Sequence, residues 1–207
     1  MSARRMKETP EELLLRPMKL GRPAELKEEQ VKEIQRQLAK RLDADQELRR
    51  NMRAGPGGVT KDDIAKMVKI DRDNTAYLKK LLGEVGWIDG GRFGKAAAGG
   101  AFLIVQHSGD LPMMLAAVPE IEKDVKAGKG DGQAFALLYD RTQLMLGGRQ
   151  RYGSQVGSAN GKFVVFPLED RKKVDEHRKS LGMQPLEDYL KLFGADIKDV
   201  LFLDDEP

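Results

Sequence analysis

The sequence predicts a mainly α-helical protein: a single helical domain that carries one small β-hairpin at about residues 150–166. Apolar residues recur every three or four positions over much of the chain, which is the spacing of helices with one buried face. One segment combines strand-forming residues with an Asn-Gly turn, as a hairpin requires. A chain of 207 residues can enclose one full core. We therefore expect an N-terminal arm at 1–24, the helical domain with its hairpin at 25–194 and a C-terminal tail at 195–207.

The first predicted helix covers residues 25–52, where apolar residues keep one face and charged residues fill the rest. The glycine-rich segment 54–58 ends this helix. The same periodicity, interrupted by glycine-containing connections, predicts most of the other helices. They are expected at 95–107, 113–127, 132–146, 171–181 and 186–193.

Capping residues define a further helical stretch at 60–85. Thr60, with Asp63 three residues later, predicts its start, and Gly86 predicts its end. Asp71 offers a second cap inside the stretch. The pattern therefore leaves open whether 60–85 forms one helix or two.

The connections are predicted from turn chemistry. Residues 87–94 contain three glycines and two aromatic residues, which predicts a loop anchored to the core. In the hairpin, we expect strands at 150–156 and 162–166, joined by a turn at 157–161 that ends in Asn-Gly.

Composition excludes several classes of protein. The 36 Lys and Arg residues nearly balance the 33 Asp and Glu residues, so the chain lacks an overall basic footprint for nucleic acid. The absence of cysteine excludes disulfides, zinc–thiolate sites and cysteine nucleophiles. The longest apolar run, 96–106, is too short to span a membrane. The charged N-terminus lacks the apolar core of a signal peptide, so we expect a cytoplasmic protein.

Candidate site residues are polar groups placed among apolar ones, because an unpaired buried polar group costs about 1–3 kcal/mol. Gln106 and His107 end the apolar run 102–105, and Asp140 and Arg141 interrupt an apolar helix. An imidazole such as that of His107 can accept and donate a proton. A structural ion pair is an equally good explanation of Asp140 and Arg141.

Two further pairs lie at helical spacing. Asp45 and Arg49 are four residues apart, and Asp71 and Asn74 are three apart. The simpler interpretations are a surface ion pair for the first and a helix cap at Asp71 for the second. His177 lies in a charged helical face and is not considered a site residue.

Residues 147–155 carry an unusual set of side chains for a connection. A hairpin explains the three glycines of this segment but not Gln150, Tyr152 and Gln155, which accompany two arginines. Such groups can donate hydrogen bonds to a ligand or to developing negative charge. No pair of histidines or carboxylates has the spacing typical of metal ligands, so we expect no metal site.

In their order along the chain, these elements resemble a largely bacterial domain family of unknown function that is marked by a Gln-x-Tyr-Gly-Thr/Ser-Gln element. The matching pieces lie between about 40 and 156 and are Asp45-Gln46-x-x-Arg49, Asp71-x-x-Asn74, Gly86-Trp87, Gln106-His107, Asp140-Arg141 and Gln150-Arg151-Tyr152-Gly153-Ser154-Gln155. The chain departs from the family at Ile88, where proline is usual, and at Ser154, where threonine is usual. The resemblance implies a mostly helical domain with these residues gathered in one place, and it implies no reaction.

The residue chemistry is typical of a small hydrolase or another acid–base enzyme that activates water and acts on a polar or anionic substrate. Asp140 or Asp71 could orient His107 in such a site, and Arg141 could bind an anion. The predicted catalytic residues are His107, Asp140, Arg141 and Tyr152; the predicted binding residues are Asp45, Arg49, Asp71, Asn74, Gln106, Gln150 and Gln155. Cofactor and oligomeric state are not specified by the sequence.

Two alternatives belong to other classes. The same polar residues could form a ligand- or peptide-binding module without turnover. Residues 59–94 also have the cadence of a winged helix-turn-helix, which would indicate DNA binding. Asp71 and Asp73 at the start of its recognition helix would repel phosphate, so nucleic acid is the less favoured partner.

Overall fold

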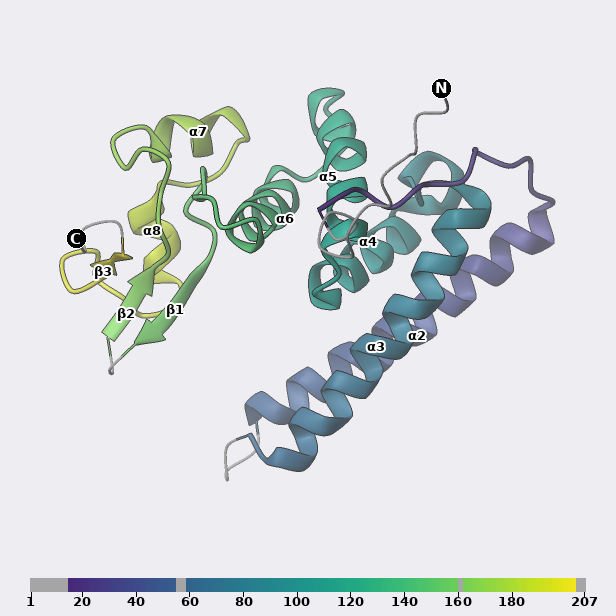
Figure 1. Ribbon diagram of the computed structural model, residues 1–207, viewed down its shortest axis with the longest axis horizontal. Coiled ribbons are helices and arrows are strands. Elements are labelled where there is room, and N and C mark those ends of the chain that lie inside the picture. Colours follow the sequence, from purple (N-terminus) through teal and green to yellow (C-terminus); the bar gives the residue numbers. More distant parts are fainter. Residues whose placement is uncertain (1–14, 55–58, 160–161, 204–207) are drawn as a thin grey trace, which may run out of the picture. The chain divides into compact units, whose positions relative to one another are not determined.

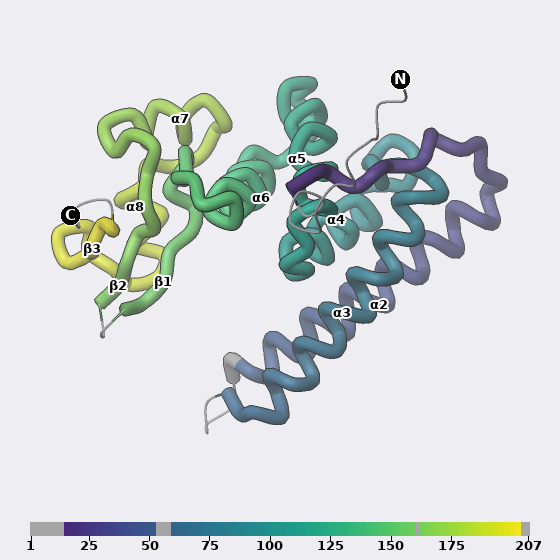
Figure 2. The backbone as a smooth tube through the Cα atoms, in the orientation of Figure 1, coloured from purple at the N-terminus to yellow at the C-terminus, as the bar shows by residue number. Residues whose placement is uncertain are grey.

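The computed structural model describes residues 15–54, 59–159 and 162–203. It confirms a mainly helical fold with a small hairpin (Figure 1). By their internal contacts, the residues form two compact units, Met1–Ala117 and Val118–Pro207. Figure 2 follows the backbone through both units. The boundary falls within helix α5 (Leu111–Lys126).

Unit 1 is built on an antiparallel pair of long helices, α2 (Glu28–Ala54) and α3 (Lys61–Val85), and α4 (Gly90–Ser108) packs against both (Figure 1). Helices α2 and α4 meet at Gly100, where an added Cβ would make ordinary contacts of 3.8 Å with Leu38 and Leu42. The core of this unit is mostly apolar. It includes Leu38, Leu78, Leu82, Ile88, Phe93, Ala101 and Val105.

The stretch 60–85, which the sequence left as one helix or two, is the single helix α3. Thr60 and Asp63 form the expected capping box, and Gly86 ends the helix with φ 79°. Asp71 does not interrupt the helix because its side chain bonds Arg49 instead of a nearby backbone amide. The cap interpretation of Asp71 is therefore wrong.

Helix α4 begins earlier than predicted. The carboxylate of Asp89 accepts hydrogen bonds from the amides of Gly91 and Arg92, and this cap starts the helix at Gly90. Gly94 (φ 78°) leaves the helical conformation and kinks the chain there. The predicted loop 87–94 is thus shorter than expected. The described part of the predicted arm, 15–24, lies in unit 1, where Gly21 N donates to Leu82 O at 2.9 Å.

Unit 2 contains α6 (Gly132–Met145), α7 (Val174–Ser180), α8 (Leu186–Lys191) and a three-stranded sheet of order β1-β2-β3. β1 (Val156–Ala159) is antiparallel to β2 (Lys162–Val165), and β2 is parallel to β3 (Leu201–Phe202). Apolar residues of the sheet and of α7 and α8 form its core. They include Val165, Leu168, Val174, Leu186, Tyr189, Leu190 and Phe202.

Two features of the sheet differ from the prediction. The first strand starts at Val156, and residues 150–155, which were predicted as strand, form a loop. Residues 157–159 of the predicted turn belong to β1, and the Asn-Gly pair lies outside the described residues. β3 lies within the predicted tail 195–207, where Phe202 is buried against β2. Within the described segments, none of the helices combines the length and the apolar character that a bilayer span requires.

Candidate functional site

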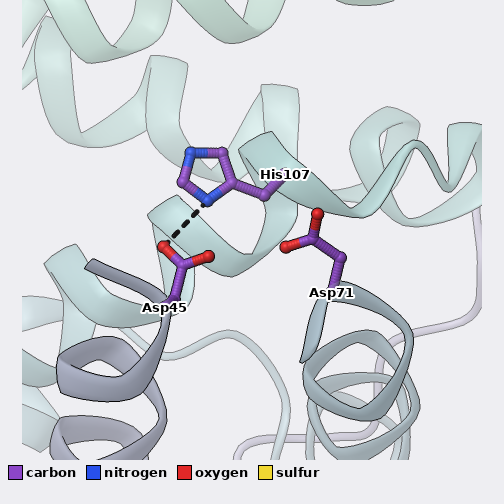
Figure 3. A group of neighbouring side chains, drawn as sticks. All are labelled: Asp45, Asp71 and His107. Atoms are coloured by element: carbon purple, nitrogen blue, oxygen red, sulfur yellow. Dashed lines mark ion pairs between the residues drawn. The ribbon is translucent and has the colours of Figure 1, made fainter. Parts of the chain in front are cut away.

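The predicted site residues fall into two groups, one in each unit. In unit 1, Asp45, Arg49, Asp71 and His107 lie together; we call them the His107 cluster (Figure 3). In unit 2, contacts join Asp140, Arg141, Gln150, Tyr152 and Gln155 around residues 150–155, which we call the Tyr152 loop. The idea that all these residues share one pocket stays a prediction.

In the His107 cluster, side chains from three helices converge. Asp45 belongs to α2, Asp71 to α3 and His107 to the last turn of α4. Figure 3 shows the two carboxylates approaching the imidazole from separate helices. His107 Nδ1 lies 3.1 Å from Asp45 Oδ2. Because a carboxylate only accepts, Nδ1 carries the proton of this bond, and a neutral ring therefore presents Nε2 as an acceptor.

Asp45 is held from three directions. Arg49 Nε donates to Oδ1 at 2.8 Å, while Gln46 Nε2 donates to Oδ2 at 2.8 Å beside the histidine. The Asp45 side chain is only 5% exposed, so the surface-pair interpretation of Asp45 and Arg49 is wrong. Burial raises the pKa of Asp45, but the hydrogen bonds and charges of His107 and Arg49 outweigh it and lower the pKa to about 2. Asp45 is thus a fixed anion against the imidazole.

Arg49 joins α2 to α3. Its Nη2 donates to Asp71 Oδ1 at 2.7 Å, and its Nη1 lies 3.3 Å from Met67 Sδ. With Nε on Asp45, all three guanidinium nitrogens have a partner within the protein. Burial raises the pKa of Asp71, and Arg49 offsets this only in part. Arg49 therefore balances the charges of Asp45 and Asp71. This is a structural role and not the ligand binding that was predicted for Arg49.

The same cluster has the composition of a metal site. Ligand atoms of Asp45, Asp71 and His107 all lie within 4.8 Å of one another. Arg49, however, already bonds both carboxylates, so a divalent cation would meet a resident positive charge. It would also have to replace the hydrogen bond between Asp45 and His107. These contacts favour a hydrogen-bonded cluster over a metal centre.

We expect Asp45 to stabilise the fold at neutral pH and to lose this contribution in acid. Its folded pKa of about 2 lies below the ordinary value of 3.8, so the stabilisation is present above 3.8 and is lost as the pH falls through about 2. The shift corresponds to about 2 kcal/mol of unfolding free energy. Urea unfolding of the wild type and of Asp45→Asn across this pH range measures the contribution of Asp45. Other carboxylates titrate in both proteins, so their effect cancels in the difference. A difference between the two that does not shrink in acid would contradict the assignment.

The remaining predicted residues of unit 1 lie near this cluster in sequence but have other contacts. Asn74 is 5% exposed, and its Oδ1 accepts a hydrogen bond from Arg41 Nη1 at 3.1 Å. Gln106 is buried in α4 next to His107. Asp45, Arg49 and Asp71 thus lie together with His107, whereas Asn74 is hydrogen-bonded to Arg41.

In unit 2, Asp140 organises the backbone of the Tyr152 loop. Its carboxylate accepts from the amides of Arg151 at 2.8 Å, Tyr152 at 3.1 Å and Ser154 at 2.9 Å. Asp140 is fully buried, and burial raises its pKa although the three amides act in the opposite direction. Because the loop uses these acceptor sites, the contacts favour a structural role for Asp140.

The two glutamines brace the same loop. Gln150 is fully buried; its Nε2 donates to Phe166 O at 2.7 Å, and its Oε1 accepts from the amide of Gln155 at 2.9 Å. The Gln155 side chain accepts from Arg141 Nε at 3.2 Å and donates to Leu137 O at 3.1 Å. These side chains thus hold the loop against Phe166, just after β2, and against α6.

Aromatic packing accounts for Tyr152. Its ring is 7% exposed and meets Phe135 and Tyr139 edge to face, with centroids 6.0 and 5.7 Å apart. Contacts of this kind stabilise a core and require no ligand.

Arg178 was not predicted as a site residue, yet it is the largest fully buried side chain among the described residues. Its Nη1 donates to Tyr152 O at 2.8 Å, and its Nε donates to Gln184 O at 2.6 Å. The hydroxyl of Tyr189 donates to Ser154 O at 3.0 Å. The many charged residues of α7 indicate a solvent-exposed helix, which is why Arg178 was overlooked. Val174 and Arg178 are four residues apart and share one face, and this spacing could have indicated that Arg178 is buried.

The chain belongs to a family of unknown function, DUF6624, whose model matches residues 32–199. This match confirms the resemblance to a domain family without an assigned reaction, and it includes both groups of site residues. No curated protein matches the chain. No solved structure matches it either.

Proposed function

We propose that this protein is an acid–base enzyme, most simply a hydrolase that activates water and acts on a polar or anionic substrate. The observation that carries the proposal is the contact between Asp45 Oδ2 and His107 Nδ1 at 3.1 Å. The imidazole is partly accessible, with 20% of its side chain exposed, whereas the carboxylate is buried. A buried anion behind a partly exposed imidazole is suited to proton transfer at Nε2.

The roles follow from these contacts. His107 Nε2 accepts a proton from water as the water attacks the substrate, and the protonated ring later returns it to the leaving group. Asp45 positions the ring and stabilises its charged form, as the carboxylate of a catalytic triad does. Arg49 and Gln46 hold Asp45 in place. In this mechanism, Asp140 and Tyr152 transfer no proton.

The role predicted for Arg141 in unit 2, binding of an anionic group, stays a prediction. A guanidinium can bind a carboxylate or phosphate with two parallel hydrogen bonds. In the structure, Arg141 Nε donates to Gln155 Oε1 at 3.2 Å.

The test is turnover by wild type, His107→Gln and His177→Gln in a panel of phosphomonoesters, carboxylic esters and amides. We expect His107→Gln to lower kcat/KM about 10²–10⁴-fold, the usual range for losing a general base. His177→Gln removes the other histidine of the chain and should preserve turnover. Activity of His107→Gln that stays near the wild-type value would remove His107 from the mechanism.

The alternatives are outcomes of the same experiment. Ligand binding without turnover across the panel would favour a binding module over an enzyme. The DNA-binding hypothesis receives no support from unit 1, because α3 is one continuous helix where a helix-turn-helix needs a turn. The segment predicted as its wing contains the start of α4 instead.

A further inference from the structure

A cavity of about 300 Å³ lies between α2 and α3, apart from the His107 cluster. Its polar lining comes from Gln37, Lys40, Arg41, Asp73 and Asn74. Leu38 and Leu42 of α2 face α4 at Gly100. Lys40 and Ala44 follow those leucines by two residues, a rotation of about 200°, so the cavity opens on the side of α2 turned away from α4.

The cavity carries an excess of positive charge. Lys40 and Arg41 both line it, and within the parts of the chain that the structure describes neither forms an ion pair with a carboxylate. Its single acidic residue, Asp73, is already bonded to Lys69 Nζ at 2.7 Å. The two cations and the single anion give the lining one net positive charge.

The guanidinium of Arg41 is fixed in place before any ligand arrives. Its Nη1 donates to Asn74 Oδ1 at 3.1 Å, and its central carbon lies 4.0 Å from the centroid of the Tyr77 ring. Arg41 Nε is buried and lacks a hydrogen-bond partner among the described residues. A buried donor without a partner requires an explanation, and a ligand that is bound in the working protein is one.

We infer that this cavity binds the phosphate group of a small phosphorylated molecule. A phosphate monoester carries about −1.5 to −2 charges at neutral pH, which matches the two cations of Lys40 and Arg41. The planar guanidinium supplies directed hydrogen bonds and the lysine a mobile point charge. The volume exceeds what the phosphate alone requires, so part of the esterified group lies inside the cavity as well. This site is independent of the proposed acid–base function.

The test is calorimetric titration of the full chain with inorganic phosphate and with glycerol 3-phosphate at constant ionic strength. Arg41→Gln should weaken the binding of both by about tenfold or more, which is the loss of one charge-assisted pair. The matched control is Arg36→Gln, the same change on the same helix at an exposed residue that pairs with Glu33. The control should bind both ligands as the wild type does.

Two further variants keep the test decisive if Arg41→Gln does not fold. Arg41→Lys retains the positive charge but loses the paired N–H donors of the guanidinium, and Lys40→Gln removes the second cation. Each of these variants should weaken phosphate binding, whereas Arg36→Gln should not. Equal weakening by the control would show non-specific attraction and overturn the proposal. So would wild-type protein that binds neither ligand, or that binds succinate more tightly than glycerol 3-phosphate.

Discussion

Replacing Asp140 with asparagine is expected to lower the free energy of unfolding by about 3–5 kcal/mol, among the larger effects of a single substitution. The carboxylate is fully buried and accepts hydrogen bonds from three backbone amides of the Tyr152 loop. Asparagine presents an NH₂ group to some of these donors, so at least one buried amide loses its acceptor. Bonds to a charged group are also about twice as strong as bonds to a neutral one.

Urea unfolding, followed by circular dichroism, measures this effect. Asp188→Asn is the matched control, because Asp188 lies in α8 with about half of its side chain exposed and bonds Lys191 Nζ at 3.1 Å on the protein surface. The control should change the unfolding free energy by less than about 1 kcal/mol. A loss for Asp140→Asn no larger than that of the control would show that the loop does not depend on this carboxylate.

Replacing Arg49 with methionine is expected to destabilise the protein by about 3–5 kcal/mol, the cost of leaving buried charges without their partner. The substitution preserves packing near Met67 but removes the cation between Asp45 and Asp71. Two carboxylates whose oxygens lie within 4.8 Å of each other then repel in a poorly solvated place. The pKa of Asp71, already raised by burial, should rise further.

A double mutant separates charge from packing. Adding Asp71→Asn to Arg49→Met removes the repulsion, so the pair should cost less than the sum of the single changes in urea unfolding. Arg36→Met serves as the control, since Arg36 and Glu33 are both more than half exposed. It should lower the unfolding free energy by less than about 1 kcal/mol. Strict additivity would mean that Arg49 does not balance the two carboxylates.

Local signals were enough to predict most helices. Apolar periodicity and the capping box at Thr60 act within a few residues, and α2 and α3 begin and end close to the predicted positions. The prediction of a strand at 150–156 was wrong because a partner distant in sequence determines the conformation of residues 150–155. The amides of Arg151, Tyr152 and Ser154 bond Asp140 on another helix, and no local pattern contains that partner.

The sequence predicted which residues belong to the candidate site better than it predicted which of them contact one another. His107 was identified from its position after an apolar run, and Asp45, Arg49 and Asp71 from their spacing. From the sequence, Asp140 or Asp71 is the expected partner of His107, whereas Asp45 makes the hydrogen bond. That pairing depends on how α4 packs against α2, which the periodicity of either helix does not contain.

The Tyr152 loop is held at its backbone by two buried charges of opposite sign. Asp140 binds its amides from α6, and Arg178 binds the carbonyl of Tyr152 from α7, 26 residues further along the chain. A peptide of residues 147–166 contains neither charge. We therefore expect that such a peptide, by itself, does not hold the conformation of the Tyr152 loop.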